Sequence, residues 1–155
     1  MIAVDRLLAH WAAQGLPLAK GVPEEEIKTF ESRYALTLPD DLRTYFMRVN
    51  GMVQQGGVDT DQEGFAFWPL ERVRPLAVVC EEEKVAIPTV EEPDRYLVIA
   101  DYLQWSWGFA IRIGPAENIV ILVGVMDNGV IANSFTEFVS LYVDDAEALY
   151  PKLNP

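Results

Sequence analysis

The apolar positions of residues 23–51 recur at helical spacing in two consecutive blocks. In the first block, Ile27, Phe30 and Tyr34 stand three and four residues apart, which places them on one face of a helix. In the second block, one helical face is formed by Leu42, Tyr45, Phe46 and Val49. Each block begins with a proline followed by acidic residues, as the first turn of a helix favours. The pattern predicts two short amphipathic helices, the second ending at Asn50-Gly51.

A further helical pattern precedes this pair. Residues 2–14 place Leu7, Leu8 and Trp11 on one side, and Gly15 ends the pattern. We expect residues 15–21 to form a linker between this helix and the helical pair.

The middle of the chain changes to the patterns of loops and β-strands. Residues 52–64 predict a polar loop, and residues 65–69 predict a short strand that ends at Pro69. Residues 72–83 are ambiguous, although one helical face is formed by Val73, Leu76, Ala77 and Cys80. The acidic segment 81–94, with two prolines, is typical of a solvated loop or a variable insertion.

Residues 95–132 predict successive strands. Residues 95–101 and 119–126 are apolar runs, which indicates buried strands. Residues 105–113 alternate, so that one face holds Trp105, Trp107, Phe109, Ile111 and Ile113. Asp127-Asn128-Gly129 predicts a hairpin turn into a strand over residues 130–132.

The chain closes with another helix. A capping box formed by Ser134 and Glu137 marks its start, and Pro151 marks its end. Its apolar face comprises Phe135, Phe138, Val139, Tyr142, Ala146 and Leu149. Helices first, strands next and a closing helix predict an α+β fold. We expect a single domain over residues 1–155, with a mainly antiparallel sheet of about five strands flanked by N-terminal helices and a C-terminal helix.

The charge balance narrows the possible partners. The chain has 155 residues, with 24 acidic residues against 12 lysines and arginines, a formal net charge of −12. Residues 53–94 hold 10 of the acids and 3 of the bases, so this region is the most acidic. Nucleic acid and anionic membranes are disfavoured as direct partners because both are negative. A basic protein partner is favoured.

Residue types that carry catalysis or bind metals are scarce. The single histidine, His10, and the single cysteine, Cys80, cannot form a His-based metal site, and a buried Cys80 with a surface His10 is favoured over a Cys–His dyad. We expect no catalytic, cofactor-binding or metal-binding residues. The apolar runs are too short to span a membrane, and the N-terminus does not resemble a signal peptide, so we expect a cytoplasmic protein.

Two alternatives involve the carboxylates of residues 59–63. The spacing of Asp59, Asp61 and Glu63 resembles the start of a calcium-binding loop, but the twelfth position is Leu70 instead of glutamate. A solvated loop is therefore the favoured interpretation. The same carboxylates could instead form a hydrolase or ligand site with Asp101, if they converge in a pocket with separated pKa values.

The order of several short motifs resembles the SUKH superfamily. That superfamily includes Smi/Knr-type fungal cell-wall regulators and many bacterial immunity proteins. The matching residues of the helical pair are Pro23, Ile27, Phe30, Glu31, Leu38, Pro39, Asp41 and Asn50-Gly51. The segments 67–70, 96–101 and 131–138 follow in the expected order. The first helix and the segment 81–93 have no assigned counterpart.

This resemblance implies a non-catalytic protein-binding domain. The function it favours is that of an immunity protein, which neutralises a cognate toxin, such as a basic nuclease, by direct binding. The alternative is a regulatory or scaffold module of the Smi/Knr type with a non-toxin partner. From the charge distribution, we predict that the partner docks on the acidic residues Asp59, Asp61, Glu63, Glu81, Glu82, Glu83, Glu91, Glu92 and Asp94.

Overall fold

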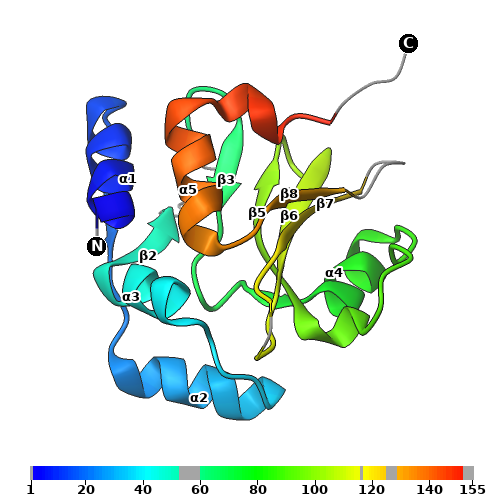
Figure 1. Cartoon of the computed structure of the whole chain (residues 1–155). Helices are drawn as coiled ribbons and strands as arrows, with labels where there is room; N and C mark the ends of the chain where they lie inside the picture. The colour runs from blue at the N-terminus through cyan, green and yellow to red at the C-terminus, as the bar shows by residue number, and fades with distance from the viewer. Residues whose placement is uncertain (1, 53–59, 116, 125–128, 152–155) are drawn as a thin grey trace.

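The computed structural model describes residues 2–52, 60–115, 117–124 and 129–151. Its helices are α1 (Ile2–Ala13), α2 (Glu24–Tyr34), α3 (Asp40–Arg48), α4 (Leu76–Glu83) and α5 (Phe135–Asp144), with the 3-10 turns η1 (Pro93–Arg95) and η2 (Ala146–Leu149). Its strands are β1 (Leu18–Lys20), β2 (Val49–Met52), β3 (Phe65–Phe67), β4 (Arg74–Pro75), β5 (Tyr96–Tyr102), β6 (Trp107–Arg112), β7 (Val120–Val123) and β8 (Val130–Ala132). Figure 1 shows the first three helices on one side of the central sheet and α4 on the other.

The central sheet has six strands. Five follow the order β3-β5-β6-β7-β8, and β4 pairs with β5 beside β3. Every neighbouring pair in this sheet is antiparallel. Strands β1 and β2 form a separate two-stranded sheet. The predicted α+β fold is therefore confirmed, with six strands in the main sheet where the sequence pattern predicts about five.

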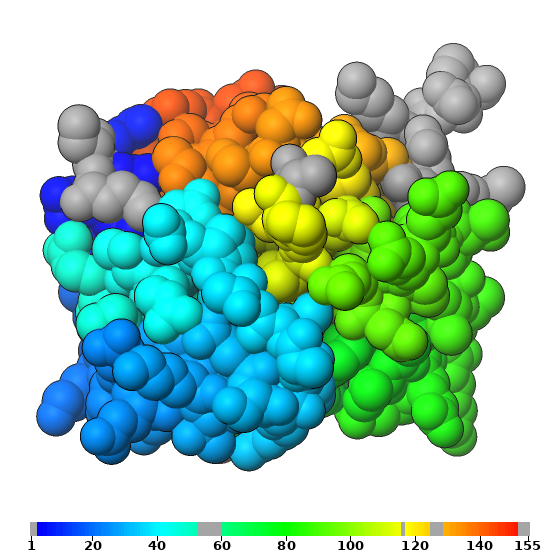
Figure 2. All heavy atoms as spheres, turned by 60° about the horizontal axis from the view of Figure 1, so that its bottom comes forward, coloured from blue at the N-terminus to red at the C-terminus, as the bar shows by residue number. Residues whose placement is uncertain are grey.

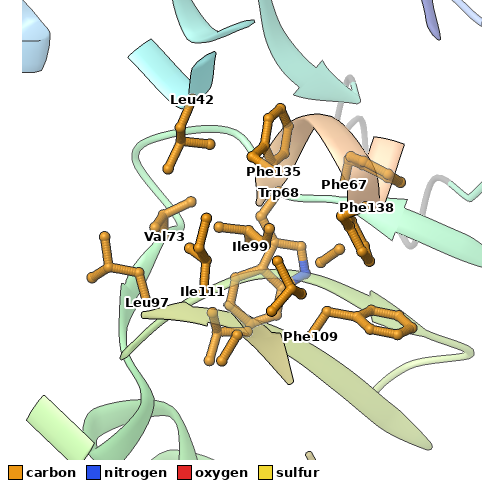
Figure 3. Close-up of a cluster of buried hydrophobic side chains, with 14 of the residues drawn as sticks. Leu42, Phe67, Trp68, Val73, Leu97, Ile99, Phe109, Ile111, Phe135 and Phe138 are labelled. Carbon is orange, nitrogen blue, oxygen red and sulfur yellow. The ribbon is translucent and has the colours of Figure 1, made fainter. Parts of the chain in front are cut away.

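One face of the main sheet carries large aromatic side chains and is covered by α5. Tyr102 pairs with Phe65 on one side and with Trp107 on the other, so the three side chains share this face. The ring of Phe109 lies 5.2 Å from that of Phe138, which extends from α5. Figure 3 shows part of this buried cluster. The burial of the aromatic face against α5 is a main source of hydrophobic stabilisation.

The start of α5 is fixed by two side chains. Ser134 Oγ accepts a hydrogen bond from the Glu137 N–H at 3.0 Å, which confirms the predicted start of the helix. Asp41 Oδ2 accepts hydrogen bonds from both the N–H and the hydroxyl of Thr136, each at 2.9 Å. Because Asp41 belongs to α3, these bonds join the helical pair to the closing helix. That helix ends earlier than expected, at Asp144, and the turn η2 follows it.

Two features of the helical pair differ from the prediction. The expected linker over residues 15–21 contains β1, which pairs with β2. The helix α3 ends at Arg48, so Asn50-Gly51 lies in β2 instead of ending a helix. The reason is the extended backbone of Val49, a β-branched residue that already belongs to the strand.

Gly51 occupies a position that only glycine accommodates without strain. Its φ is +65°, and an added Cβ would stand 2.6 Å from the carbonyl oxygen of Trp68. Asn50 also holds β2 close to the segment that follows β3. Its side-chain oxygen accepts a hydrogen bond from the Leu70 N–H at 2.7 Å, and its Nδ2 donates to Glu71 at 2.9 Å. The Asn-Gly pair thus joins the helical pair to the main sheet.

We predict that Gly51→Ala lowers the free energy of unfolding by roughly 2–4 kcal/mol, because the strain of a left-handed φ adds to the overlap with the Trp68 carbonyl. Urea denaturation measures the loss. Gly15→Ala is the matched control: Gly15 has a φ of +74°, but nothing lies within 4 Å of an added Cβ. We expect a loss of about 1 kcal/mol there. Equal losses in the two variants would contradict a role for the close approach.

Candidate protein-docking surface

Six of the nine predicted docking residues lie together on one side of the molecule. They are exposed and belong to the end of α4 or to the region of η1, two elements in contact with each other. They occupy the green region of Figures 1 and 2. The six residues are Glu81, Glu82, Glu83, Glu91, Glu92 and Asp94.

Two of these carboxylates are engaged by arginines of the same chain. Glu82 Oε2 lies 2.6 Å from Arg74 Nη2, and Glu92 Oε1 lies 2.9 Å from Arg112 Nη2. Such exposed ion pairs stabilise a fold only slightly. Within the part of the chain that the structure describes, the other four carboxylates make no ion pair: Glu81, Glu83, Glu91 and Asp94. Their charge is therefore available to a partner.

Apolar side chains are exposed on the same segment. The exposed fractions are 39% for Val78, 36% for Val85 and 49% for Ile87. Exposed apolar groups bordered by charged residues are typical of protein–protein interfaces. We use the name α4–η1 surface for these three residues together with the six carboxylates.

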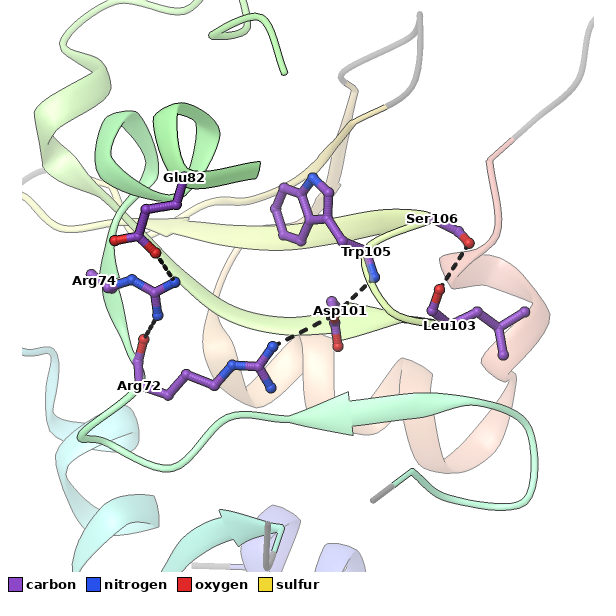
Figure 4. Close-up of polar contacts among 7 residues, drawn as sticks. All are labelled: Arg72, Arg74, Glu82, Asp101, Leu103, Trp105 and Ser106. Atoms are coloured by element: carbon purple, nitrogen blue, oxygen red, sulfur yellow. Dashed lines mark hydrogen bonds and ion pairs between the residues drawn. The ribbon is translucent and has the colours of Figure 1, made fainter. Parts of the chain in front are cut away.

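Two arginines hold the base of α4 against the sheet. The Arg72 guanidinium lies 4.1 Å from the centre of the Trp68 ring, and that of Arg74 lies 5.3 Å from it. Both distances are within the range of cation–π attraction. Because Arg74 also pairs with Glu82, it links the α4–η1 surface to the buried indole beneath. Figure 4 shows Arg74 and Glu82 beside α4, and Arg72 next to Asp101.

A buried carboxylate lies next to these arginines. Asp101 of β5 is only 2% exposed, and its Oδ2 accepts a hydrogen bond from the Trp105 N–H at 3.0 Å. The same oxygen lies 4.0 Å from Arg72 Nη2. Burial raises the pKa of the Asp101 carboxyl above its ordinary value, although Arg72 opposes this shift. Burial also lowers the pKa of the Arg72 guanidinium.

Asp101 supports a strained turn between β5 and β6. Leu103, Gln104 and Trp105 have successive φ values of +43°, +53° and +67°, which bulky residues rarely adopt. The Trp105 ring packs where a Cβ on Gly108 would stand, 2.2 Å from the nearest ring atom. Gly108 and its partner Asp101 stand next to the pair of Trp107 and Tyr102, so they face the opposite side of the sheet. The Trp105 ring therefore lies on the face opposite the aromatic one. The prediction that Trp105 shares a face with Trp107 and Phe109 is therefore wrong, because the strand begins only after the turn.

Asp61 does not belong to the exposed surface. It is 6% exposed, and its Oδ1 accepts hydrogen bonds from the N–H groups of Glu63, Gly64 and Phe65 at 2.8–2.9 Å. Its Oδ2 accepts a hydrogen bond from the Tyr142 hydroxyl. The expectation that Asp61 binds a partner is corrected on this basis, because its acceptors are used within the fold. Glu63 is exposed, whereas Asp59 lies outside the described residues.

Asp61 and Asp101, the two buried carboxylates that the hydrolase alternative would bring together, do not converge. Asp61 bonds to Tyr142, which packs on the aromatic face of the sheet, 4.7 Å from the ring of Phe67. Asp101 lies on the opposite face, beside Arg72. The sheet thus separates Asp61 from Asp101, so these two described carboxylates do not form the acid–base pair of the hydrolase alternative.

The geometry also gives no support for metal or thiol chemistry. Among the residues placed by the structure, no three histidines, cysteines or carboxylates are grouped so that they could hold a metal ion. Cys80 is buried in α4, whereas His10 lies on α1, 5.3 Å from the ring of Tyr142. Within the same described ranges, no helix is long and apolar enough to cross a membrane.

Sequence reasoning did not identify the groups beneath the α4–η1 surface. Arg72 and Arg74 stand at alternate positions after Trp68, in the most acidic part of the chain. That spacing is the signal that could have indicated two cations on one face of a short strand. No local signal revealed that Asp101 would hold the Trp105 N–H.

The fold and this surface define an α+β domain with exposed acidic and apolar side chains on one segment. The family model of the SMI1 / KNR4 family (SUKH-1) matches residues 21–141. The chain belongs to this family, which confirms the resemblance seen in its sequence motifs. Helix α1 lies outside the matched residues, as the motif pattern predicts. No curated protein matches the chain.

We predict that Asp61→Ala lowers the free energy of unfolding by about 3 kcal/mol or more, because three backbone N–H groups and the Tyr142 hydroxyl lose their acceptor. Thermal and urea denaturation measure the loss. The neighbouring exposed residue supplies the control, and Glu63→Ala should change stability by less than about 0.5 kcal/mol. Comparable stabilities of the two variants would contradict the structural role of Asp61.

A second prediction concerns Asp101 and pH. Because folding raises the pKa of Asp101 above its ordinary value of 3.8, its contribution to stability is greatest below that pH and declines as pH rises toward the folded-state pKa. Asp101→Asn does not titrate but keeps an acceptor for the Trp105 N–H. We expect the free energy of unfolding of the wild type, relative to that of this variant, to fall as pH rises from about 3.8. Urea denaturation at several acidic pH values measures this difference. A difference independent of pH would contradict the shift.

Proposed function

We propose that this protein is a non-catalytic immunity protein that neutralises a cognate bacterial toxin by direct binding. The observation that carries the proposal is the α4–η1 surface, where exposed carboxylates and exposed apolar side chains occupy the same segment of the chain. Membership of the SMI1 / KNR4 family supports the same class, because the SUKH superfamily includes many bacterial immunity proteins. Such a protein would act in the cytoplasm of the cell that it protects.

The chemistry of the surface favours a basic partner such as a nuclease. A nuclease must bind phosphate groups, so its active site is generally positive and attracts acidic side chains. The unpaired carboxylates Glu81, Glu91 and Asp94 would speed the encounter and align the two proteins. The exposed side chains of Val78, Val85 and Ile87 would then slow dissociation by losing contact with water. Occlusion of the active site would inhibit the toxin.

The second candidate is a regulatory or scaffold module of the Smi/Knr type. The same surface would then bind a basic protein that is not a toxin. The neighbouring genes distinguish the two, since an immunity protein is expected beside a gene for a large secreted protein with a toxin domain. That toxin domain is also the partner for the direct test.

We predict that Glu81→Lys combined with Glu83→Lys slows association with the neighbouring toxin domain by about tenfold at low ionic strength, because the steering charge is reversed. Glu82 is left in place so that its ion pair with Arg74 remains. Stopped-flow or surface plasmon resonance at several salt concentrations measures the association rate. The salt dependence of that rate should also weaken.

The control is Glu25→Lys combined with Glu26→Lys, which makes the same change of net charge on exposed positions of α2. This variant should retain most of the association rate. An equal effect of both variants would show that net charge alone matters. Unchanged binding in the α4 variant would contradict docking on the α4–η1 surface.

A further inference from the structure

A small groove lies between α2 and the segment that follows β3. Its volume is about 260 Å³, below the range of about 300–1,000 Å³ for sites that hold a drug-sized ligand. In Figure 1, α2 lies at the bottom and α4 at the right, and no residue of the α4–η1 surface lines the groove. The groove therefore has room for about one residue of a ligand. The described residues that line it are Glu26, Thr29, Phe30 and Arg33 of α2, with Leu70 and Glu71 of the segment after β3.

The floor of the groove is apolar. Phe30 is only 4% exposed and Leu70 only 5%, and both side chains belong to the hydrophobic core. The Phe30 ring packs against the ring of Tyr34, with the two ring centres 4.9 Å apart. An aliphatic chain that lies on this floor would be stabilised by its loss of contact with water.

The wall opposite α2 is fixed by Asn50. Its side-chain oxygen accepts a hydrogen bond from the Leu70 N–H, and its Nδ2 donates to Glu71 Oε2 at 2.9 Å. This donor is a neutral amide, so it does not cancel the charge of Glu71, and the carboxylate keeps acceptor sites for other donors. Glu71 thus gives the groove a negative group that is held in place without a ligand.

The charged residues of α2 stand at opposite ends of the groove. Glu26 and Arg33 are seven residues apart, so they share one face of α2 and lie about 10 Å apart along its axis. Both are exposed, and neither takes part in an ion pair within the described ranges. With Glu71, the lining holds two negative groups and one positive group. Its complement is a ligand that carries a cation and an anion at the two ends of an apolar chain.

We infer that the groove binds the C-terminal residue of a peptide when that residue is arginine. Its guanidinium faces Glu26 and Glu71, its aliphatic stem lies on the apolar floor, and its terminal carboxylate faces Arg33. The five N–H donors of a guanidinium can bond to two carboxylates at once, which favours arginine over lysine. Free arginine fits less well, because its α-ammonium group adds a cation next to Arg33. The site goes beyond the proposed function, because it does not use the α4–η1 surface.

The test compares three acetylated tripeptides at low ionic strength. The first is glycyl-glycyl-arginine with a free C-terminus, the second is its C-terminal amide, and the third carries citrulline, a neutral analogue of the same shape, with a free C-terminus. NMR titration of the amide signals of Phe30, Arg33 and Leu70 measures the affinities. We expect the first peptide to bind about threefold more tightly than each of the others. Equal affinities, or no shift at these signals, would overturn the inference.

Variants at the two ends of the groove provide the second arm. In Arg33→Gln, the preference for the free C-terminus over the amide should disappear while the preference for arginine over citrulline remains. In Glu26→Gln, the preference for arginine should fall by about twofold while that for the free C-terminus remains. Such selective losses assign each ligand group to one side chain, which general damage to the fold would not do. An unchanged preference for the free C-terminus in Arg33→Gln would contradict the assignment.

Matched controls come from the same helix. Lys28→Gln and Glu25→Gln remove the same charges at exposed positions of α2 that do not line the groove. Both variants should keep the two preferences of the wild type. Loss of either preference in these controls would show that the overall charge of α2, and not the groove, selects the peptide.

The outcomes separate this inference from the proposed function. If the first tripeptide does not bind while the neighbouring toxin domain does, the groove site is overturned and docking on the α4–η1 surface stands. The reversal of Glu81 and Glu83 should leave tripeptide binding unchanged, and Glu26→Gln should leave toxin binding unchanged. If free arginine binds as tightly as the first tripeptide, the groove takes a small molecule and its assignment to a peptide end is overturned.

Discussion

The closing helix α5 is held by a carboxylate at each end, and the rest of the structure depends on this attachment. Asp41 accepts two hydrogen bonds from Thr136 at its start, and Asp61 accepts one from Tyr142 near its end. Both carboxylates come from the first half of the chain. Because α5 covers the aromatic face of the sheet, these contacts position a large group of buried aromatic side chains. The Trp11 indole, which donates to the Tyr142 hydroxyl at 3.0 Å, brings α1 into the same arrangement.

The carboxylates of this chain fall into two groups with different roles. Those at Glu31, Asp41, Asp61 and Asp101 are buried or half-buried, and each accepts at least one backbone N–H. Such charge-assisted bonds fix turns and helix starts. Those of the α4–η1 surface are exposed, and most have no partner in the described structure. Two of the family-pattern residues, Glu31 and Asp41, thus maintain the fold, while the candidate for recognition lies in a segment without an assigned family role.

The sequence predicts the fold better than it predicts the site. The reason is the separation along the chain of the residues that interact. The periodicity around Ile27, Leu42 and Phe138 is local, so it gives α2, α3 and α5 directly. The short strands β1 and β4 are too brief for a pattern and form only because a distant partner pairs with them. Asp61 has the same local surroundings as a surface acid. Its Oδ1 accepts three local backbone N–H groups, and the contact of its Oδ2 with Tyr142, 81 residues away, joins it to α5.

The place of α4 and η1 in the chain has a consequence for how such a domain diversifies. Their segment leaves the sheet at Pro75 and returns at Tyr96, and Pro75 is the direct partner of the next residue, Leu97, in the β4–β5 ladder. The ends of the excursion are therefore fixed by the sheet, and the entropy of closing it changes only slowly with its length. A different segment of another length and composition could be transplanted between the two strands while the ladder stays intact. Recognition could then be exchanged between relatives without redesign of the core.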